Sequence, residues 1–243
     1  MEVCVIASGS NGNCCLVENK NTSVLIDAGL SGKEIEHRMN KLGKSLENIN
    51  GIVLTHAHSD HYRGVGILSR KYNIPAYMTK TVYQNTNLGN IKVKYFNNTP
   101  FKIGNLKIEP VTTSHDIPSC GFRIGKFGIF TDTGIATKEM ETAMKRLKAA
   151  VIESNHDIDM LMNGSYPAFL KKRIISDNGH LSNTQASTFI NNFGKTLNTA
   201  LLGHLSGNNN TPQIAKQTFE TLVKQKIECN ILSRDKESGS WKV

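Results

Sequence analysis

A cluster of metal-binding side chains directly after an apolar run most constrains this chain. His56, His58, Asp60 and His61 fall within six residues, immediately after the apolar residues 52–54. His56 and His58 are two apart, so an extended segment points both to one side. Imidazoles and a carboxylate suit zinc or manganese. One tetrahedral ion cannot use all four groups and keep an open position, so the cluster predicts at least two ions. The alternative is a solvated polar loop.

Short apolar runs alternate with helical patterns along the whole chain, which favours one α/β domain. Strands are expected at 3–6, 14–17, 24–26, 52–54, 74–78, 91–96, 106–111, 122–124, 127–130, 150–152, 200–202 and, as the last, 227–232. Helices are expected from Ser31 to Gly43, at about 60–72 and 138–147, from Ser182 to Gly194, and from Pro212 onward. Ser31 with Glu34, and Ser182 with Gln185, have the spacing of capping boxes.

Candidate polar residues recur at or just beyond the ends of these apolar strands. They are Asp27, His56, Asp132, His156 and His204. Strand ends are rigid, and their side chains can converge at one edge of a sheet. The pattern therefore predicts a polar site above an apolar core.

Length and composition exclude several classes of protein. The 243 residues suit one compact domain, and no apolar stretch is long enough to span a membrane. The start, Met1–Ile6, is expected to be a strand and not an export signal. Five cysteines, an odd number without a C-x-x-C pair, predict free thiols in a reducing cytoplasm. No obligate protein partner is evident.

The formal net charge of +9 indicates a surface that attracts polyanions. Small basic clusters occur at Lys92 and Lys94, at 145–148 and at 171–173. A soluble basic surface without a specific partner is the alternative. Charge therefore favours nucleic acid only modestly.

The His-x-His-x-Asp-His pattern at 56–61 resembles the signature of the metallo-β-lactamase superfamily. His115 in Thr-Ser-His-Asp, Asp132 in Thr-Asp-Thr-Gly and His204 in Gly-His-Leu-Ser follow in the order of that family's landmarks. The resemblance spans essentially the whole chain. It implies a metal-dependent hydrolase with a four-layer αββα sandwich and two metals at one edge.

The resemblance also implies how the ligands divide. One ion would be held by His56, His58 and His115, and the second by Asp60, His61 and His204, with Asp132 bridging them. A hydroxide shared by the metals would be the nucleophile, and Asp60 would orient or deprotonate it.

Two further motifs bear on the substrate. His180, in Gly-His-Leu-Ser-Asn before a helix, resembles the element that protonates the leaving oxygen in tRNA-processing phosphodiesterases of this superfamily. A helix N-terminus favours phosphate, and a histidine near neutral pKa can act as a general acid. The alternative is a packed histidine before a helix. The glycine-rich turn at 8–13, with Ser10 and Asn13, could line the site or be only a tight hairpin loop.

Taken together, these motifs resemble the WalJ (YycJ) family of bacterial proteins. That resemblance implies a cytoplasmic, single-domain DNA 5′→3′ exonuclease that uses two divalent ions, Mn²⁺ or Zn²⁺. His156 would touch substrate or support the site, with Glu153 and Asp157 as its partners. Unlike larger nucleases of the superfamily, the chain has no room between Asp132 and His204 for an extra clamp domain.

Other functions remain open from the sequence. The nearest is hydrolysis of small cyclic or dinucleotide phosphodiesters, followed by a thioesterase or lactonase. A different class is a non-catalytic DNA-binding or regulatory protein with a structural metal site. Tyr62 and Tyr166 could stack on bases, but a partly buried core position is favoured for both.

Overall fold

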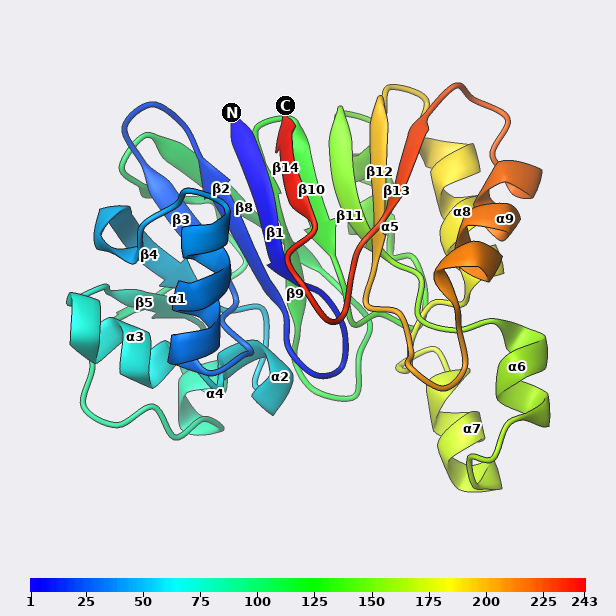
Figure 1. Ribbon diagram of the computed structural model, residues 1–243, viewed down its shortest axis with the longest axis horizontal. Coiled ribbons are helices and arrows are strands. Elements are labelled where there is room, and N and C mark those ends of the chain that lie inside the picture. Colours follow the sequence, from blue (N-terminus) through cyan, green and yellow to red (C-terminus); the bar gives the residue numbers. More distant parts are fainter. The chain divides into compact units, whose positions relative to one another are not determined.

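The computed structural model describes residues 1–243, which divide into two compact units. Unit 1 comprises Met1–Pro110 and Ser233–Val243, and unit 2 comprises Val111–Leu232. Sheets flanked by helices occur along the chain (Figure 1), as the α/β prediction requires. No helix is both long enough and apolar enough to cross a lipid bilayer.

Unit 1 is built on one sheet with the strand order β14-β1-β2-β3-β4-β5-β6. Its strands are β1 (Glu2–Ala7), β2 (Cys14–Glu18), β3 (Ser23–Ile26), β4 (Ile49–Val53), β5 (Ala76–Met78), β6 (Val93–Tyr95) and β14 (Gly239–Lys242), with the hairpin β7 (Phe101–Ile103) and β8 (Leu106–Thr112). Its helices are α1 (Gly32–Lys41), η1 (Leu46–Asn48), α2 (Ser59–Tyr62), α3 (Val65–Tyr72) and α4 (Lys80–Gln84). β3, β4 and β5 run parallel, so the residues that follow β3 and β4 meet at one edge.

The core of unit 1 lies between this sheet and α1 and α3. Leu25 and Ile52 from the sheet are fully buried together with Ile35 and Met39 of α1 and Val65 of α3. Those α1 residues are the apolar stripe expected from their spacing. The stripe therefore determines how α1 lies on the sheet.

Unit 2 contains the strand order β13-β12-β11-β10-β9. Its strands are β9 (Cys120–Ile124), β10 (Phe127–Phe130), β11 (Ala149–Glu153), β12 (Thr199–Gly203) and β13 (Glu228–Ile231). Its helices are α5 (Lys138–Met144), α6 (Ile158–Asn163), α7 (Ala168–Ile174), α8 (Asn183–Phe193) and α9 (Pro212–Leu222). β10, β11, β12 and β13 are parallel, which again brings their carboxyl ends to one edge.

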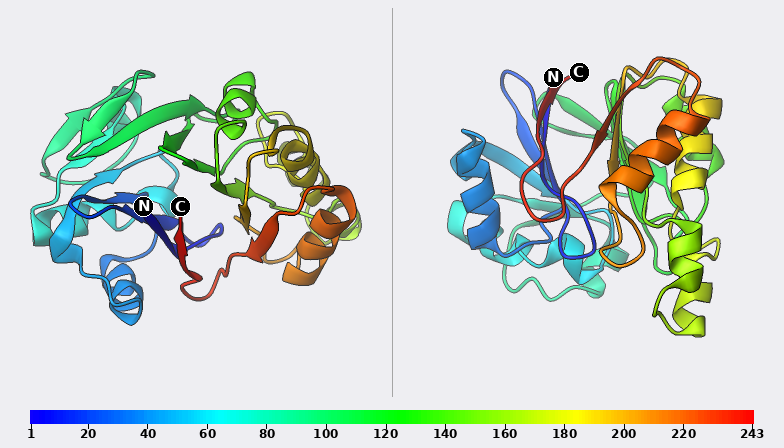
Figure 2. Two further views of the ribbon diagram at one scale, coloured as in Figure 1. Left: turned by 90° about the horizontal axis from the view of Figure 1, so that it is seen from above. Right: turned by 45° about the vertical axis from the view of Figure 1, so that its right-hand side comes forward.

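Helices α8 and α9 lie side by side on one face of the unit 2 sheet (Figure 2). Phe130 and Leu202 of the sheet pack in one buried cluster with Met140 of α5, Phe189 of α8 and Phe219 of α9. α8 begins at the full capping box predicted for Ser182 and Gln185. The carboxyl-terminal edge of the strands stays outside this apolar cluster and is left for polar residues.

Several predicted elements need correction. The helix expected at 60–72 is two helices, because the Gly64 amide donates to the Ala28 carbonyl at 2.7 Å. Strand 227–232 is not the last, since β14 pairs with β1. Glu34 does not complete a capping box with Ser31 in the way Gln185 does, because its carboxylate pairs with Arg38 at 2.7 Å.

The short elements β7, α4, α6 and α7 were not expected. Each has at most seven residues, and such segments carry little periodic signal of their own. They are held by their neighbours in the fold, which the sequence pattern does not display.

Candidate functional site

The His-x-His-x-Asp-His segment joins the end of β4 to α2 in unit 1. His56 and His61 are buried, whereas His58 and Asp60 are partly exposed. Nε2 of His56 and Nδ1 of His58 lie 3.1 Å apart. Two nitrogens each about 2.1 Å from one tetrahedral ion would be separated by about 3.4 Å. The pair therefore fits two ligands of a single ion.

Asp27 follows β3 and contacts the Nδ1 atom of His61, which fixes the orientation of the imidazole ring. Its Oδ2 lies 2.7 Å from His61 Nδ1 and accepts from the Thr55 hydroxyl at 2.8 Å, while its Oδ1 accepts from the Thr55 amide at 2.9 Å. A carboxylate at Nδ1 leaves the Nε2 lone pair of the ring for a metal. Asp27 was noted as a strand-end residue, but its role was missed because residues 27 and 61 are distant in sequence.

The glycine-rich turn is tied to the same segment through Asn13. The Asn13 amide nitrogen Nδ2 lies 3.0 Å from His61 Nε2 and 3.4 Å from Asp60 Oδ2. The Asn13 backbone amide donates to the Asp60 carbonyl at 2.8 Å. Ser10, the other candidate in this turn, is exposed.

Gly29 permits the close approach of these segments. Its amide donates to the Asn13 carbonyl at 2.8 Å, and a Cβ at this position would lie 1.6 Å from the Asp60 carbonyl oxygen. Any larger residue would displace backbone that carries Asp60. Glycine is therefore required here by packing against the segment that carries Asp60.

A second cluster lies at the carboxyl edge of the unit 2 sheet. Ligand atoms of Asp132, Glu153, His180 and His204 all lie within 4.8 Å of one another. Asp132 Oδ1 is 3.6 Å from His204 Nε2 and 3.7 Å from Nε2 of His115. Five sequence-predicted residues thus come together in this unit.

Glu153 contacts several other residues of this cluster. Its Oε1 lies 2.6 Å from His180 Nδ1 and 2.8 Å from His204 Nδ1, and its Oε2 accepts from the Thr133 amide at 3.0 Å. The prediction that Glu153 is a partner of His156 did not anticipate these two histidines. It was made from sequence proximity, whereas β11 and β12 are adjacent strands that bring Glu153 beside Gly203.

The histidines of both units share one arrangement that fits metal ions. Nδ1 of His61, His115 and His204 faces Asp27, the Gly179 carbonyl at 3.2 Å and Glu153, respectively. In each case the arrangement favours a proton on Nδ1 and a lone pair on Nε2. This is how proteins orient metal-binding histidines.

Three residues of the clusters have left-handed backbone. Asp27, Asp132 and His204 have φ of 59°, 56° and 54°. Such values are uncommon outside glycine and cost energy, so surrounding contacts must maintain them. All three lie just after an apolar strand, where the turn aims the side chain across the sheet edge.

Electrostatics couples Glu153 to His180. Burial opposes the charge of both groups, but each stabilises the other: the pKa of Glu153 is lowered and the pKa of His180 is raised. The imidazole thus readily carries a proton while Glu153 remains ionised. This is the protonation state that a general acid requires.

His156 lies behind the cluster in unit 2. It is 1 % exposed, and its Nδ1 has no hydrogen-bond partner. Asp157, the other expected partner, instead caps α6 by accepting from the Met160 amide at 2.9 Å. Burial lowers the pKa of His156 to about 4, so the ring is neutral at pH 7.

Asparagines near His156 were missed by the sequence analysis. Asn155 Nδ2 donates to the His204 carbonyl at 3.0 Å. Asn210 Nδ2 donates to the Ser154 carbonyl and to Asn183 Oδ1, both at 2.8 Å. The run of three asparagines, Asn208–Asn210, stands out in the sequence and could have indicated these residues. Its contacts become clear only when α8 and the loop after β12 are placed together.

The two tyrosines considered for base stacking have different surroundings. Tyr62 is partly buried against the unit 1 core, as favoured from the sequence. The Tyr166 hydroxyl accepts from Asn208 Nδ2 at 3.0 Å. Neither contact indicates a stacking site.

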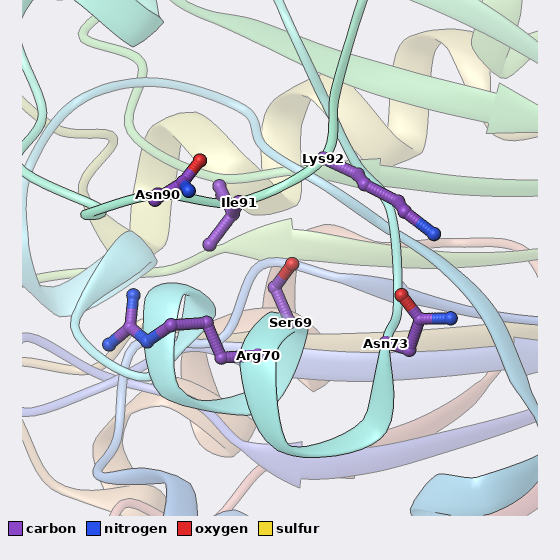
Figure 3. Close-up of a pocket in the computed structure, with 6 residues that line it drawn as sticks. All are labelled: Ser69, Arg70, Asn73, Asn90, Ile91 and Lys92. Atoms are coloured by element: carbon purple, nitrogen blue, oxygen red, sulfur yellow. The ribbon is translucent and has the colours of Figure 1, made fainter.

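A surface pocket in unit 1 is separate from these clusters. Its volume is about 270 Å³, and Arg70, Asn73 and Lys92 are among its lining residues. The guanidinium of Arg70 and the ammonium of Lys92 point in different directions in Figure 3. They do not converge on one ligand.

The family model described as "Beta-lactamase superfamily domain" matches residues 22–204, which include both clusters. The chain belongs to this superfamily. It is a metal-dependent hydrolase with the metallo-β-lactamase fold, as the sequence motifs predicted.

Relatives place the chain more narrowly within the superfamily. It is 37% identical to "Exodeoxyribonuclease WalJ" of Streptococcus pneumoniae serotype 2, with 91% of this chain and 87% of that protein covered. It is 34% identical to "Exodeoxyribonuclease YycJ" of Bacillus anthracis, with 91% and 89% covered. The expected membership in the WalJ (YycJ) family is therefore confirmed.

Solved structures agree on the fold. The metallo-β-lactamase fold protein YhfI of Bacillus subtilis matches with a TM-score of 0.77 and 18% identity, over 99% of each chain. At this level of identity the match supports the superfamily fold.

Proposed function

We propose that this chain is a metal-dependent DNA exonuclease that degrades DNA in the 5′→3′ direction. The observation that carries the DNA substrate is the identity of 37% over 91% of the chain to a protein named an exodeoxyribonuclease. The net charge of +9 suits an anionic substrate. The pairing of His180 with Glu153 suits a reaction in which a leaving oxygen needs a proton.

The proposed metal ligands are those implied by the superfamily motifs. His56, His58 and His115 would hold one divalent ion, and Asp60, His61 and His204 a second, with Asp132 shared. The orientation of His61 by Asp27 and of His204 by Glu153 supports this assignment. Mn²⁺ or Zn²⁺ bound there would lower the pKa of a water molecule and so supply the nucleophile at neutral pH.

The chain's own groups would handle the protons. Asp60 accepts a proton from the attacking water or orients it. His180, charged because of Glu153, donates a proton from Nε2 to the departing oxygen, since its Nδ1 faces that carboxylate. Glu153 is thus the group that keeps His180 protonated and in position.

We further propose that residues 1–243 act as one metallo-β-lactamase domain without a clamp domain. The family match from 22 to 204 includes parts of both compact units, which supports one functional domain. A DNA substrate in a bacterial-type enzyme also favours the cytoplasm.

The test is digestion of 5′-phosphorylated duplex DNA by protein loaded with Mn²⁺. Label at either end distinguishes the direction of shortening. We expect His58→Ala to be inert and His180→Ala to lose about 10²- to 10⁴-fold in kcat. His37→Ala is the matched control, because His37 is exposed on α1.

Intact DNA after incubation with metal-replete wild-type protein would refute the proposal. Hydrolysis of bis(p-nitrophenyl) phosphate without loss of DNA would instead indicate a small phosphodiester as substrate. Chelation that lowers the Tm of a protein without any hydrolytic activity would indicate a structural metal site.

A further inference from the structure

Exposed apolar side chains gather on α6, α7 and the residues beside them. Ile158, Met162, Phe169 and Ile175 are all exposed, and Phe169 is the most exposed large apolar side chain, at 76%. A concentration of this kind marks an interaction surface more often than a single exposed residue does. The segment is therefore a candidate for binding a partner.

The charge of α7 indicates an anionic partner. Lys171, Lys172 and Arg173 lie in its last turn and α7 has no acidic residue, whereas Asp157 and Asp159 lie at the start of α6. Lys172 and Arg173 are three and four positions after Phe169, so they lie on the same side of α7 as the phenyl ring. An aromatic ring next to cations is the combination that binds single-stranded nucleic acid, by base stacking and phosphate pairing.

The carboxyl end of α7 is joined directly to the unit 2 cluster. The Ile174 carbonyl accepts from the His180 amide at 2.9 Å, and Gly179 presents its carbonyl to His115 Nδ1. Arg173 also pairs with Asp116, next to His115. A ligand on α7 would thus lie beside the groups proposed to act on a phosphodiester.

Within unit 2, α6 and α7 extend away from the strands, in contrast to α8 and α9 (Figure 1). Lys171 Nζ donates to the Met162 carbonyl at 2.7 Å and joins the two helices. They form a small projecting pair with the Phe169 side exposed.

We propose that the α7 surface, defined as Phe169 and Lys172, binds the single-stranded part of the DNA substrate next to the site of cleavage. A base stacks on Phe169 and a phosphate pairs with Lys172, while Arg173 keeps its pairing with Asp116. The inference rests on the proposed DNA exonuclease function and adds to it the strand-binding surface.

Binding is measured with metal-loaded protein and a fluorescent single-stranded phosphorothioate oligonucleotide, which resists cleavage. We expect Phe169→Ala and Lys172→Ala each to raise Kd about tenfold. Lys172→Ala should also reduce the slope of log K against log salt by about 0.7, the value for one phosphate contact on a single strand. Ile67→Ala and Lys195→Ala, exposed positions elsewhere, are the controls and should bind as the wild type does.

Digestion assays separate this inference from the proposed function. If both hold, the two α7 variants raise KM for DNA more than they lower kcat. Digestion and oligonucleotide binding that are both insensitive to Phe169 and Lys172 would overturn the inference and leave the nuclease intact. Oligonucleotide binding that depends on Phe169 and Lys172, without digestion of DNA by the wild type, would overturn the nuclease alone. The inference would also be overturned if Phe169 were required for self-association or for binding to anionic vesicles but not for DNA binding.

Discussion

Asp27 and Glu153 perform the same task in different units. Each is a buried carboxylate at or just after a parallel strand, and each faces the Nδ1 atom of a histidine from the sequence motifs. Neither is proposed as a ligand. Their value lies in fixing which nitrogen of His61 or His204 is presented, and loss of such a partner typically costs about 10- to 100-fold in metal affinity.

We expect His156 to make the stability of the protein sensitive to acid. Because burial lowers its pKa from 6.5 to about 4, the folded chain binds fewer protons at this ring than the unfolded chain between these pH values. The stability that depends on a neutral ring is present above about pH 6.5 and falls as the pH drops toward 4, by up to about 1.4 kcal/mol per pH unit. Urea unfolding of His156→Gln should therefore show a weaker pH dependence in this window.

The exposed His37 provides the control for that measurement. His37→Gln should follow the wild-type pH dependence. An unchanged pH dependence in His156→Gln would show that the ring does not stay neutral in the folded protein.

The turns after parallel strands determine how the site is assembled in each unit. In unit 1 the turns after β1, β3 and β4 are linked by backbone hydrogen bonds among Asn13, Gly29 and Asp60, with Ala28 and His61 joined in the same way at 2.8 Å. Such a network of hydrogen bonds is rigid, so a change in one turn also displaces the turns bonded to it.

Gly29→Ala tests this coupling. Because the added methyl group would meet the Asp60 carbonyl, we expect a loss of about 1–3 kcal/mol of stability together with weaker metal binding. Calorimetric unfolding and metal titration measure the two effects. Gly43→Ala is the contrast: its φ of 68° is strained for alanine, but a Cβ there meets nothing within 4 Å. It should cost stability without weakening metal binding, and equal effects of both variants on metal affinity would contradict the coupling.

At the level of elements, the long amphipathic segments were predictable and the short ones were not. α1 and α9 show their apolar stripes, and Thr211 and Pro212 signal the start of α9. The break between α2 and α3 was missed because the Gly64 amide bonds outside its own helix, to Ala28. A hydrogen bond to a partner outside the helix does not change the spacing of apolar residues from which a helix is predicted.

Metal removal is a test of the whole molecule. The proposed ligands come from residues 56–61 in unit 1 and from His115, Asp132 and His204 in unit 2. A ligand that binds only the folded chain raises its stability. Chelation should therefore lower Tm, by several degrees or more, and added Mn²⁺ or Zn²⁺ should restore it. The protein is first shown to carry metal. If chelation then leaves its Tm unchanged, the result would argue against this ligand set.

The sequence by itself determined the superfamily, the α/β class and the residues proposed as metal ligands, because ligand chemistry demands particular side chains at particular spacings after apolar strands. Only the tertiary structure decided what surrounds them. It placed Asp27 against Nδ1 of His61, and it placed Glu153 against Nδ1 of His180 and of His204 and not against His156. It also left Phe169 exposed beside two cations on α7. These outcomes depend on which strands and loops become neighbours, and contacts between residues far apart in the chain leave no local pattern to read.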